Sequence, residues 1–212
     1  MHLANLQFLD ILEYVGTFAF AISGIRMASA KRFDWFGAYV VGLATAIGGG
    51  TVRDLLLGVQ PFWMNGPSYM VWTAVALVFA LVFRQYLRRM DYTLFIFDAI
   101  GLSFFTVVGM QKSLDFGQPF WVSIIMGVLT GCAGGILRDV LINEEPLIFK
   151  KEIYATASIL GGLVLRLCVF AGLHVVVAES LGALVVLVVR IVAMQRQLAL
   201  PILKQEDEEG RL

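Results

Sequence analysis

The sequence GGGTVRD, residues 48–54, lies inside a long apolar run and returns 85 positions later as AGGILRD, residues 133–139. The same ungapped offset relates twelve identical pairs between residues 13–69 and 98–154. The pairs are Gly16/Gly101, Phe20/Phe105, Gly24/Gly109, Gly42/Gly127, Thr45/Thr130, Gly49/Gly134, Gly50/Gly135, Arg53/Arg138, Asp54/Asp139, Leu56/Leu141, Pro61/Pro146 and Tyr69/Tyr154. Apolar bias alone would rarely place so many identities in one register, so the chain contains an internal duplication.

The composition indicates an integral membrane protein. Of the 212 residues, 59% are hydrophobic and 15% are charged, and the mean hydropathy is +0.82. Soluble domains are about 45–50% apolar and about 25% charged. Charged residues gather between apolar runs that are long enough to cross a bilayer as helices. We therefore expect an all-α protein whose main partner is the lipid bilayer.

Several classes of function are not expected. The formal net charge is zero and no basic face suggests a nucleic-acid partner. Cys132 and Cys168 lie in apolar segments without metal-ligand or disulfide spacing. The sequence contains no nucleophile-base set, phosphate-binding loop or metal-ligand cluster. We predict neither an enzyme nor a cofactor.

Apolar runs between charged or Pro- and Gly-containing breaks predict seven transmembrane spans. They cover residues 9–28, 34–57, 68–87, 93–111, 119–142, 153–173 and 175–195. We expect one membrane domain over residues 1–212, with repeats at 8–87 and 93–173, an extra transmembrane helix at 175–195 and a polar cytoplasmic tail at 196–212. The seventh span has no counterpart in the repeat, and it is interpreted as a scaffold or subunit-contact helix.

Lysine and arginine follow the first, third, fifth and seventh spans, whereas Lys112 stands almost alone after the fourth. Because cytoplasmic loops carry the positive excess, the N-terminus is predicted outside and the C-terminus in the cytoplasm. Each copy of the repeat holds three spans, so the second copy enters the membrane inverted. Inverted repeats are common in proteins that move solutes.

The identical residues of the second and fifth spans are spaced by three and four positions, so they share one helix face. This face predicts a lined path, and its candidate residues are Thr45, Gly49, Arg53, Thr130, Gly134 and Arg138. Two interpretations of the glycines stay open. They allow helices to pack closely, or they break or kink the two helices, whose freed backbone groups then line a water-filled path.

Ionised residues within a membrane are costly and usually mark a function or a partner. The alternative for Arg53 and Arg138 is that their long side chains reach the interface. Glu13 and Asp98 coincide under the repeat and are possible pore partners. Glu13 is predicted to be an interfacial carboxylate at a helix start, whereas Asp98 lies deeper and can pair with Arg53 or Arg138.

The seven spans, the three-plus-three inverted repeat and the paired Gly-Gly-x-x-Arg-Asp sequences resemble the bacterial branch of the trimeric intracellular cation (TRIC) channels. The resemblance covers about residues 8–195. It implies a homotrimer in the bacterial inner membrane, with a K⁺- and Na⁺-conducting pore in each subunit. The implied pore is lined by kinked second and fifth spans, with the first and fourth spans beside them. The implied hinges are Gly49-Gly50 and Gly134-Gly135, and the implied polar pore positions are Arg53, Asp54, Arg138 and Asp139.

Two other functions stay open. A carrier of a small zwitterion such as glycine is one, because an Arg beside an Asp can hold a carboxylate and an ammonium together. A membrane scaffold without transport is the other, and it leaves the repeated polar face unexplained. Cation selectivity does not follow from the residues alone, because a positive Arg opposes cations unless Asp54, Asp139 or carbonyl oxygens offset it.

Overall fold

The structure is a computed structural model that describes residues 2–89, 92–150 and 153–199. Within these residues the chain forms eight α-helices and two short 3-10 helices. Their bounds are α1 His2–Ala30, α2 Trp35–Leu56, η1 Phe62–Asn65, α3 Ser68–Val82, α4 Arg84–Arg89, α5 Thr93–Asp115, α6 Phe120–Leu141, η2 Leu147–Phe149, α7 Ala155–Phe170 and α8 Val175–Gln195. Most of the predicted polar tail lies outside the described residues.

The helices match the predicted spans, with one difference in the third. Five helices are long and apolar enough to cross a membrane: α1 from Phe8, α2, α5, α6 and α8. Helices α3 and α7 are apolar but have 15 and 16 residues, fewer than the about 20 that a straight crossing requires. The predicted span 68–87 is divided at Phe83 into α3 and α4. The all-helical membrane fold is confirmed, and the count of seven crossings stays a prediction.

Local signals set several helix ends. Asp34 precedes α2, and its side chain accepts a hydrogen bond from the Gly37 amide at 2.7 Å. Helices α5 and α7 are followed by Gly117 and Gly172, whose φ angles are +73° and +82°. This left-handed conformation favours glycine and allows the chain to turn sharply after a helix. The turn at Gly172 separates the sixth and seventh predicted spans into the packed helices α7 and α8.

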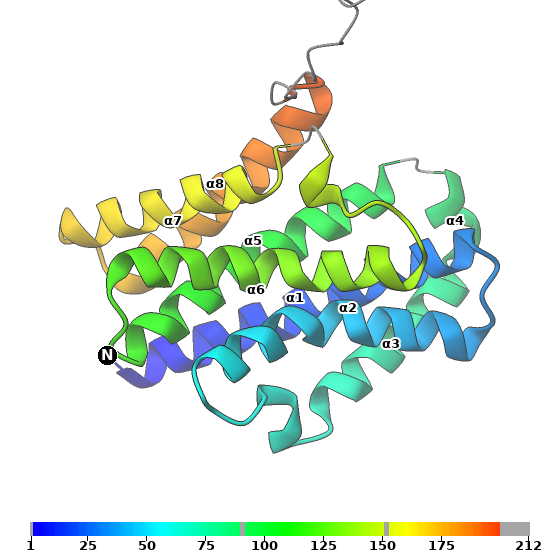
Figure 1. Ribbon diagram of the computed structural model, residues 1–212, viewed down its shortest axis with the longest axis horizontal. Helices are drawn as coiled ribbons and strands as arrows, with labels where there is room; N and C mark the ends of the chain where they lie inside the picture. The colour runs from blue at the N-terminus through cyan, green and yellow to red at the C-terminus, as the bar shows by residue number, and fades with distance from the viewer. Residues whose placement is uncertain (1, 90–91, 151–152, 200–212) are drawn as a thin grey trace, which may run out of the picture.

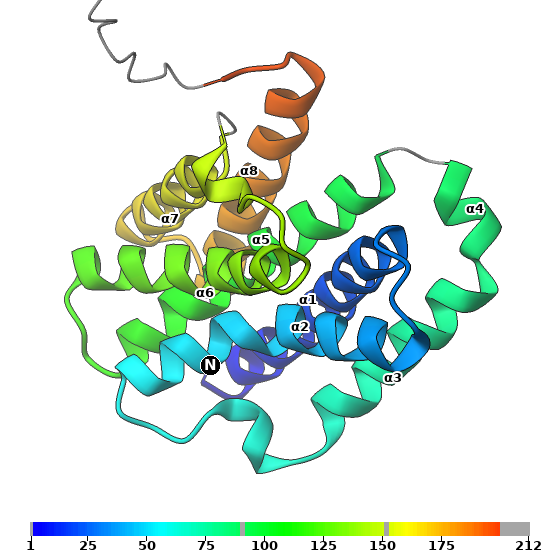
Figure 2. The ribbon, with the colours of Figure 1, turned by 45° about the vertical axis from the view of Figure 1, so that its right-hand side comes forward.

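The two repeats interlock through their first two helices. Helix α1 packs against α5 and helix α2 packs against α6, and each pair runs antiparallel (Figure 1). Helix α3 covers one side of this core, whereas α7 and α8 pack together on the other (Figure 2). The centre of the molecule is therefore built from equivalent helices of the two repeats.

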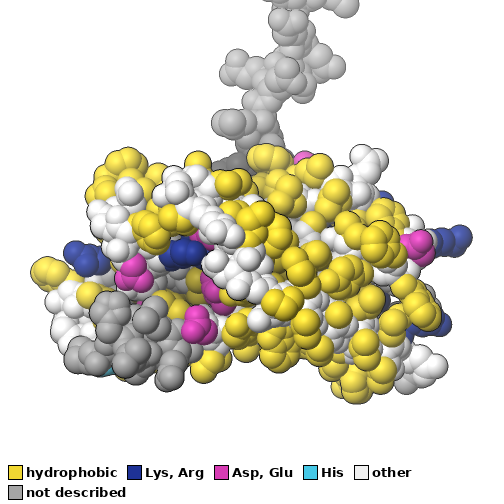
Figure 3. Space-filling model, turned by 90° about the horizontal axis from the view of Figure 1, so that it is seen from below, with side chains coloured by type: hydrophobic (Ala, Val, Ile, Leu, Met, Phe, Trp, Pro, Cys, Tyr) yellow, Lys and Arg dark blue, Asp and Glu magenta, His cyan; other side chains and the backbone are white. Residues whose placement is uncertain are grey.

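Two contacts place the arginine- and lysine-containing segments at one end of the bundle. Lys31, after α1, forms an ion pair at 2.5 Å with Glu144, after α6. Arg26, near the end of α1, donates a hydrogen bond to the Leu87 carbonyl oxygen in α4 at 3.0 Å. The ends of α1, α4 and α6 thus lie together, as the inverted repeat requires. On the face shown in Figure 3, apolar side chains cover a broad continuous area.

Candidate functional site

Arg53 is the centre of a buried charge network in the first repeat. Its side chain is 0% exposed, and its Nε donates to Asp54 Oδ1 at 2.8 Å. Its Nη1 and Nη2 lie 3.4 and 3.5 Å from Glu13 Oε1. Tyr69 donates its hydroxyl proton to Glu13 Oε2 at 2.8 Å, and Lys112 Nζ lies 2.9 Å from Asp54 Oδ1. These five residues are called the first network.

Arg138 is the centre of a second network with the same plan. Its Nε donates to Asp139 Oδ1 at 2.8 Å, and its Nη1 donates to Asp98 Oδ1 at 2.6 Å. The Tyr154 hydroxyl donates to the same Asp98 oxygen at 3.4 Å. Arg190 of α8 approaches the other Asp98 oxygen at 3.8 Å. These five residues are called the second network.

Each Arg-Asp pair also fixes the segment that follows its helix. Asp54 Oδ2 accepts a hydrogen bond from the Phe62 amide at 2.8 Å, and Asp139 Oδ2 accepts one from the Leu147 amide at 3.0 Å. Phe62 and Leu147 are the first residues of η1 and η2, where backbone amides lack helical partners. Each aspartate therefore holds an arginine with one oxygen and a returning loop with the other.

The contacts themselves repeat under the 85-residue offset. The arginine and its distant carboxylate are 40 residues apart in both networks, the tyrosine and that carboxylate are 56 apart, and the aspartate and its amide are 8 apart. The duplication thus preserved a set of interactions as well as a set of residues. Glu13 and Asp98, which are not identical, occupy the same place in it.

The two networks lie at opposite ends of the central helices. Helix α1 carries Glu13 in the first network, and farther along it Ser23 accepts a hydrogen bond from Arg138 Nη1 at 2.7 Å. Helix α5 carries Asp98 in the second network and Lys112 in the first. Because α1 and α5 run antiparallel, each helix connects one network to the other.

The glycines and threonines of the shared face bring α2 and α6 into close contact. A Cβ on Gly49 would overlap the Thr130 carbonyl oxygen, and a Cβ on Gly134 would overlap the Thr45 carbonyl oxygen. The hydroxyl groups donate within their own helices, Thr45 to Val41 and Thr130 to Met126, both at 2.6 Å. Gly50 faces the Phe62 ring, and Gly135 faces the Tyr154 hydroxyl. In this conformation the shared face is a packed crossing.

The structure removes one alternative for the glycines and overturns the prediction for Glu13. Helices α2 and α6 continue through their glycines, so neither helix is broken; a kink stays a prediction. The glycines allow α2 and α6 to pack closely against each other's backbone carbonyls, and this packing requires no break in either helix. Glu13 does not lie at a helix start, because α1 begins at His2 and places this residue well inside the helix. It is 9% exposed and pairs with Arg53 and Tyr69, which compensate its burial.

Asp98 pairs with Arg138 rather than with Arg53. Arg53 and Arg138 are both 0% exposed, so their side chains end inside the subunit rather than at its surface. The guanidinium of Arg53 also lies 5.4 Å from the centre of the Phe62 ring. Each arginine is therefore buried in the interior of the subunit, beside two carboxylates.

Sequence reasoning missed four members of the networks. Tyr69 and Tyr154 are identical under the offset, which was a usable signal. A second usable signal was the position of Arg190, a charged residue within an apolar span. Lys112 was counted only as a loop charge, although its ammonium contacts a buried aspartate.

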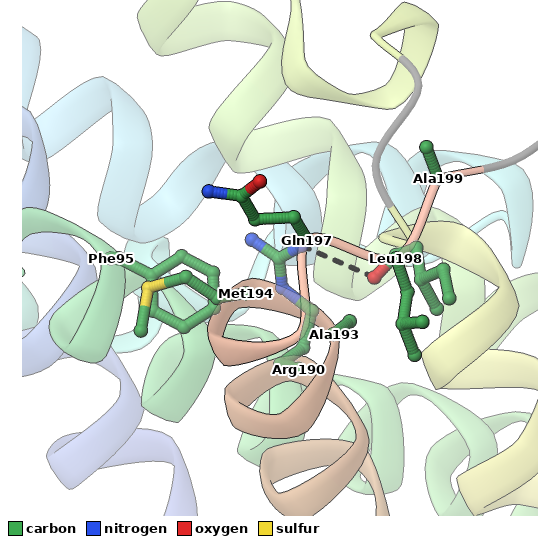
Figure 4. A pocket seen from close by; sticks show the side chains of 8 residues that line it. Phe95, Arg190, Ala193, Met194, Gln197, Leu198 and Ala199 are labelled. Carbon is green, nitrogen blue, oxygen red and sulfur yellow. Dashed lines mark hydrogen bonds between the residues drawn. The ribbon is translucent and has the colours of Figure 1, made fainter.

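Arg190 gives the seventh predicted span a part in the second network. Its guanidinium lies 4.5 Å from the centre of the Phe95 ring and 4.7 Å from that of Tyr154. A cavity of about 260 Å³ lies beside it, at the end of α8 (Figure 4). The cavity is lined by Phe95, Ile153, Arg190, Ala193, Met194, Gln197, Leu198 and Ala199. Helix α8 thus contributes a charged side chain to the second network.

The sequence matches a family model described as Glycine transporter at residues 10–85 and 95–170, one match for each repeat. It is 39% identical over 203 residues to the UPF0126 inner membrane protein YadS of Escherichia coli, covering 94% of this chain and 98% of YadS. It is 36% identical over 160 residues to the UPF0126 membrane protein YvgT of Bacillus subtilis, covering 74% of this chain and 79% of YvgT.

The fold is similar to solved TRIC structures. The TRIC trimeric intracellular cation channel orthologue from Rhodobacter sphaeroides has 34% identity and a TM-score of 0.84, covering 90% of this chain and 98% of that one. A structure that describes conductance through TRIC cation channels has 35% identity and a TM-score of 0.82, covering 93% and 98%. The chain therefore belongs to the family of bacterial membrane proteins that includes YadS and the prokaryotic TRIC channels.

Proposed function

We propose that this protein is a channel for the monovalent cations K⁺ and Na⁺, with one path through each subunit of a homotrimer. The observation that carries the proposal is the pair of equivalent charge networks at the two ends of α1 and α5. The similarity to proteins described as trimeric cation channels, at 34–35% identity, supports it. The path would run along α2 and α6 between the networks, with α1 and α5 beside it.

The charges of the networks are compatible with cations. Each arginine has two carboxylates beside it, Glu13 and Asp54 for Arg53, and Asp98 and Asp139 for Arg138. The positive charge of each guanidinium is therefore offset locally, and it does not present a positive barrier. Carboxylate oxygens are also the hard ligands that desolvated alkali cations prefer.

We infer that the described conformation is the closed state of the proposed channel. Arg53, Asp54, Asp98 and Arg138 are at most 1% exposed, and Gly49 and Gly134 each lie against a backbone carbonyl of the opposite helix. Conduction would require α2 and α6 to separate or bend at Gly49-Gly50 and Gly134-Gly135, which is the role expected of a hinge. The glycines would permit this motion because they leave no side chains in the crossing.

The membrane orientation is proposed with the N-terminus outside and the C-terminus in the cytoplasm. The Lys31–Glu144 ion pair and the Arg26–Leu87 hydrogen bond support this assignment by gathering the positively charged segments at one end. The name of the relative YadS, an inner membrane protein, supports an inner membrane location for this chain. Cysteine labelling from outside the cell would test the orientation, with Gln118→Cys expected to react and Glu144→Cys expected to be protected.

A carrier for a small zwitterion such as glycine is the second candidate. The description of the matching family supports it. The adjacent Arg53 and Asp54 could hold the carboxylate and the ammonium of an amino acid, if each released its present partner. In that case the networks would be substrate sites that open in turn to the two sides.

Purified protein in a planar bilayer, with K⁺ on both sides, separates the two functions. A channel gives unitary current steps, which reverse at the K⁺ equilibrium potential when the two concentrations differ. A carrier gives no steps but shows saturable glycine uptake in vesicles made from the same preparation. Silence in the bilayer together with glycine uptake would contradict the proposed channel.

A further inference from the structure

The charged residues that the duplication repeats, without Lys112 and Arg190, have the same net charge in both networks. Each copy contributes one arginine and two carboxylates, which sum to a formal charge of −1. The residues are Glu13, Arg53 and Asp54 in one copy and Asp98, Arg138 and Asp139 in the other. An uncompensated charge inside a protein is costly, so each copy requires one further cation.

The two copies obtain that cation from unrelated residues. Lys112 compensates the first network, where its Nζ lies 2.9 Å from Asp54 Oδ1. The position equivalent to Lys112 in the other copy is Met27, which carries no charge. Arg190 of α8, which has no counterpart in the repeat, contributes the positive charge near Asp98. Neither Lys112 nor Arg190 therefore belongs to the set of residues that the duplication repeats.

The two compensating cations also differ in how firmly they are held. The Arg190 side chain is 1% exposed, lies over two aromatic rings and donates to the Ile153 carbonyl oxygen at 3.1 Å. The Lys112 side chain is 27% exposed and extends from the last turn of α5. A lysine ammonium is a compact charge on a flexible stem, whereas a guanidinium is a rigid fork. Of these two cations, only Lys112 combines contact with a buried carboxylate and access from the end of the bundle.

We propose that Lys112 is a tethered cation that occupies Asp54 in the closed channel and competes there with permeant K⁺ or Na⁺. The inference rests on the proposed function, since it makes Lys112 a determinant of cation occupancy in the same path. An ammonium and a K⁺ ion carry the same charge and require the same carboxylate oxygen. When Lys112 swings toward solvent, the first network regains its charge of −1 and attracts a cation from the adjoining solution.

The test compares Lys112→Met, which installs the residue of the equivalent position, with Lys112→Arg and with the control Lys31→Met, which removes a lysine outside both networks. Currents are recorded in planar bilayers over a series of KCl concentrations. Lys112→Met should lower the K⁺ concentration at half-maximal conductance by about fivefold, the factor that one unit charge at 4 Å produces even at the dielectric constant of water. Lys112→Arg should remain close to the parent. Lys31→Met should not shift the concentration dependence, because Lys31 pairs with Glu144 at the surface, outside both networks.

A second measurement does not depend on conduction. Thermal unfolding is followed in KCl and in N-methyl-D-glucamine chloride of equal ionic strength. Lys112→Met should be stabilised by K⁺ relative to the large organic cation, because K⁺ can replace the missing ammonium and the organic cation cannot. The parent and Lys31→Met should show no such difference.

The outcomes distinguish the inference from the proposed channel. If the parent conducts but Lys112→Met changes neither the K⁺ dependence of conductance nor that of unfolding, the tethered-cation inference is wrong. If no variant conducts but Lys112→Met gains K⁺-dependent stability, the cation site stands and the channel proposal falls. If neither property appears in any variant, both are wrong.

Discussion

Phe20 of α1 and Phe105 of α5 stack on each other, with ring centroids 5.4 Å apart and ring planes inclined by 12°. They are equivalent residues of the two repeats, so a contact between them lies at the axis that relates the copies. Both side chains are 1% exposed. On α1 the ring lies between Glu13 of the first network and Ser23 at the second, and on α5 it lies between Asp98 and Lys112. An apolar pair thus separates the two networks.

We expect Phe20→Ala or Phe105→Ala to raise the basal K⁺ flux in proteoliposomes, because the Phe20 ring borders the proposed path at Gly134. The same changes should lower stability by about 3–5 kcal/mol through cavity formation. Phe18→Ala is the matched control, since Phe18 packs against Trp72 and Phe79 away from the axis. It should reduce stability without increasing flux. Equal flux from the parent, the two axis variants and the control would contradict a central barrier.

The second prediction concerns Gly49 and Gly134. Gly49→Ala and Gly134→Ala should each destabilise the protein by about 1–3 kcal/mol or more, because the new methyl group meets a backbone carbonyl of the opposite helix. Gly66→Ala is a suitable control, because a Cβ there has open space and the backbone φ is 172°. Thermal unfolding in detergent measures the three effects. If Gly49→Ala and Gly134→Ala are both as stable as the parent, α2 and α6 are not held together at these residues.

The third prediction uses the unequal hydrogen bonds of the two tyrosines. Tyr69→Phe should cost about 1.5–3 kcal/mol of stability, the usual range for a hydrogen bond to a charged group, since its bond to Glu13 is 2.8 Å long. Tyr154→Phe should cost less, because its bond to Asp98 is 3.4 Å long and Arg138 holds the same oxygen at 2.6 Å. A phenylalanine there also keeps the aromatic ring beside Arg190. Chemical denaturation of the two variants gives the order, and a larger loss for Tyr154→Phe would contradict it.

The duplication allowed much of the fold to be predicted, because a fixed offset of 85 residues reports equivalent positions without any knowledge of contacts. It indicated the helical repeats, the shared face and the importance of Arg53 and Arg138. It did not reveal that the shared face is a packed helix crossing, because glycine suits both a hinge and a close contact. It also could not reveal Lys112 and Arg190, since the copies differ at these positions and only the folded chain brings their charges to the carboxylates.

The charge networks predict different behaviour for stability and for flux when both arginines are removed. Arg53→Ala leaves Glu13 and Asp54 with less compensation, and Arg138→Ala does the same to Asp98 and Asp139. Each change should therefore destabilise the protein by about 3–5 kcal/mol.

The stability losses of Arg53→Ala and Arg138→Ala should add to within about 0.5 kcal/mol in the double variant, because the contacts described for the two arginines share no partner. Their effects on flux should not add, since ions that cross one path meet both networks in series. The exposed Arg84, changed to Ala, serves as a control and should alter stability by less than about 0.5 kcal/mol. Flux and thermal unfolding are measured on one proteoliposome preparation of each variant. If both single variants and the double variant match the parent in both measurements, the arginines are outside the path and the proposed pore is wrong. If the stability losses are strongly non-additive, the two networks are coupled through the helices that connect them.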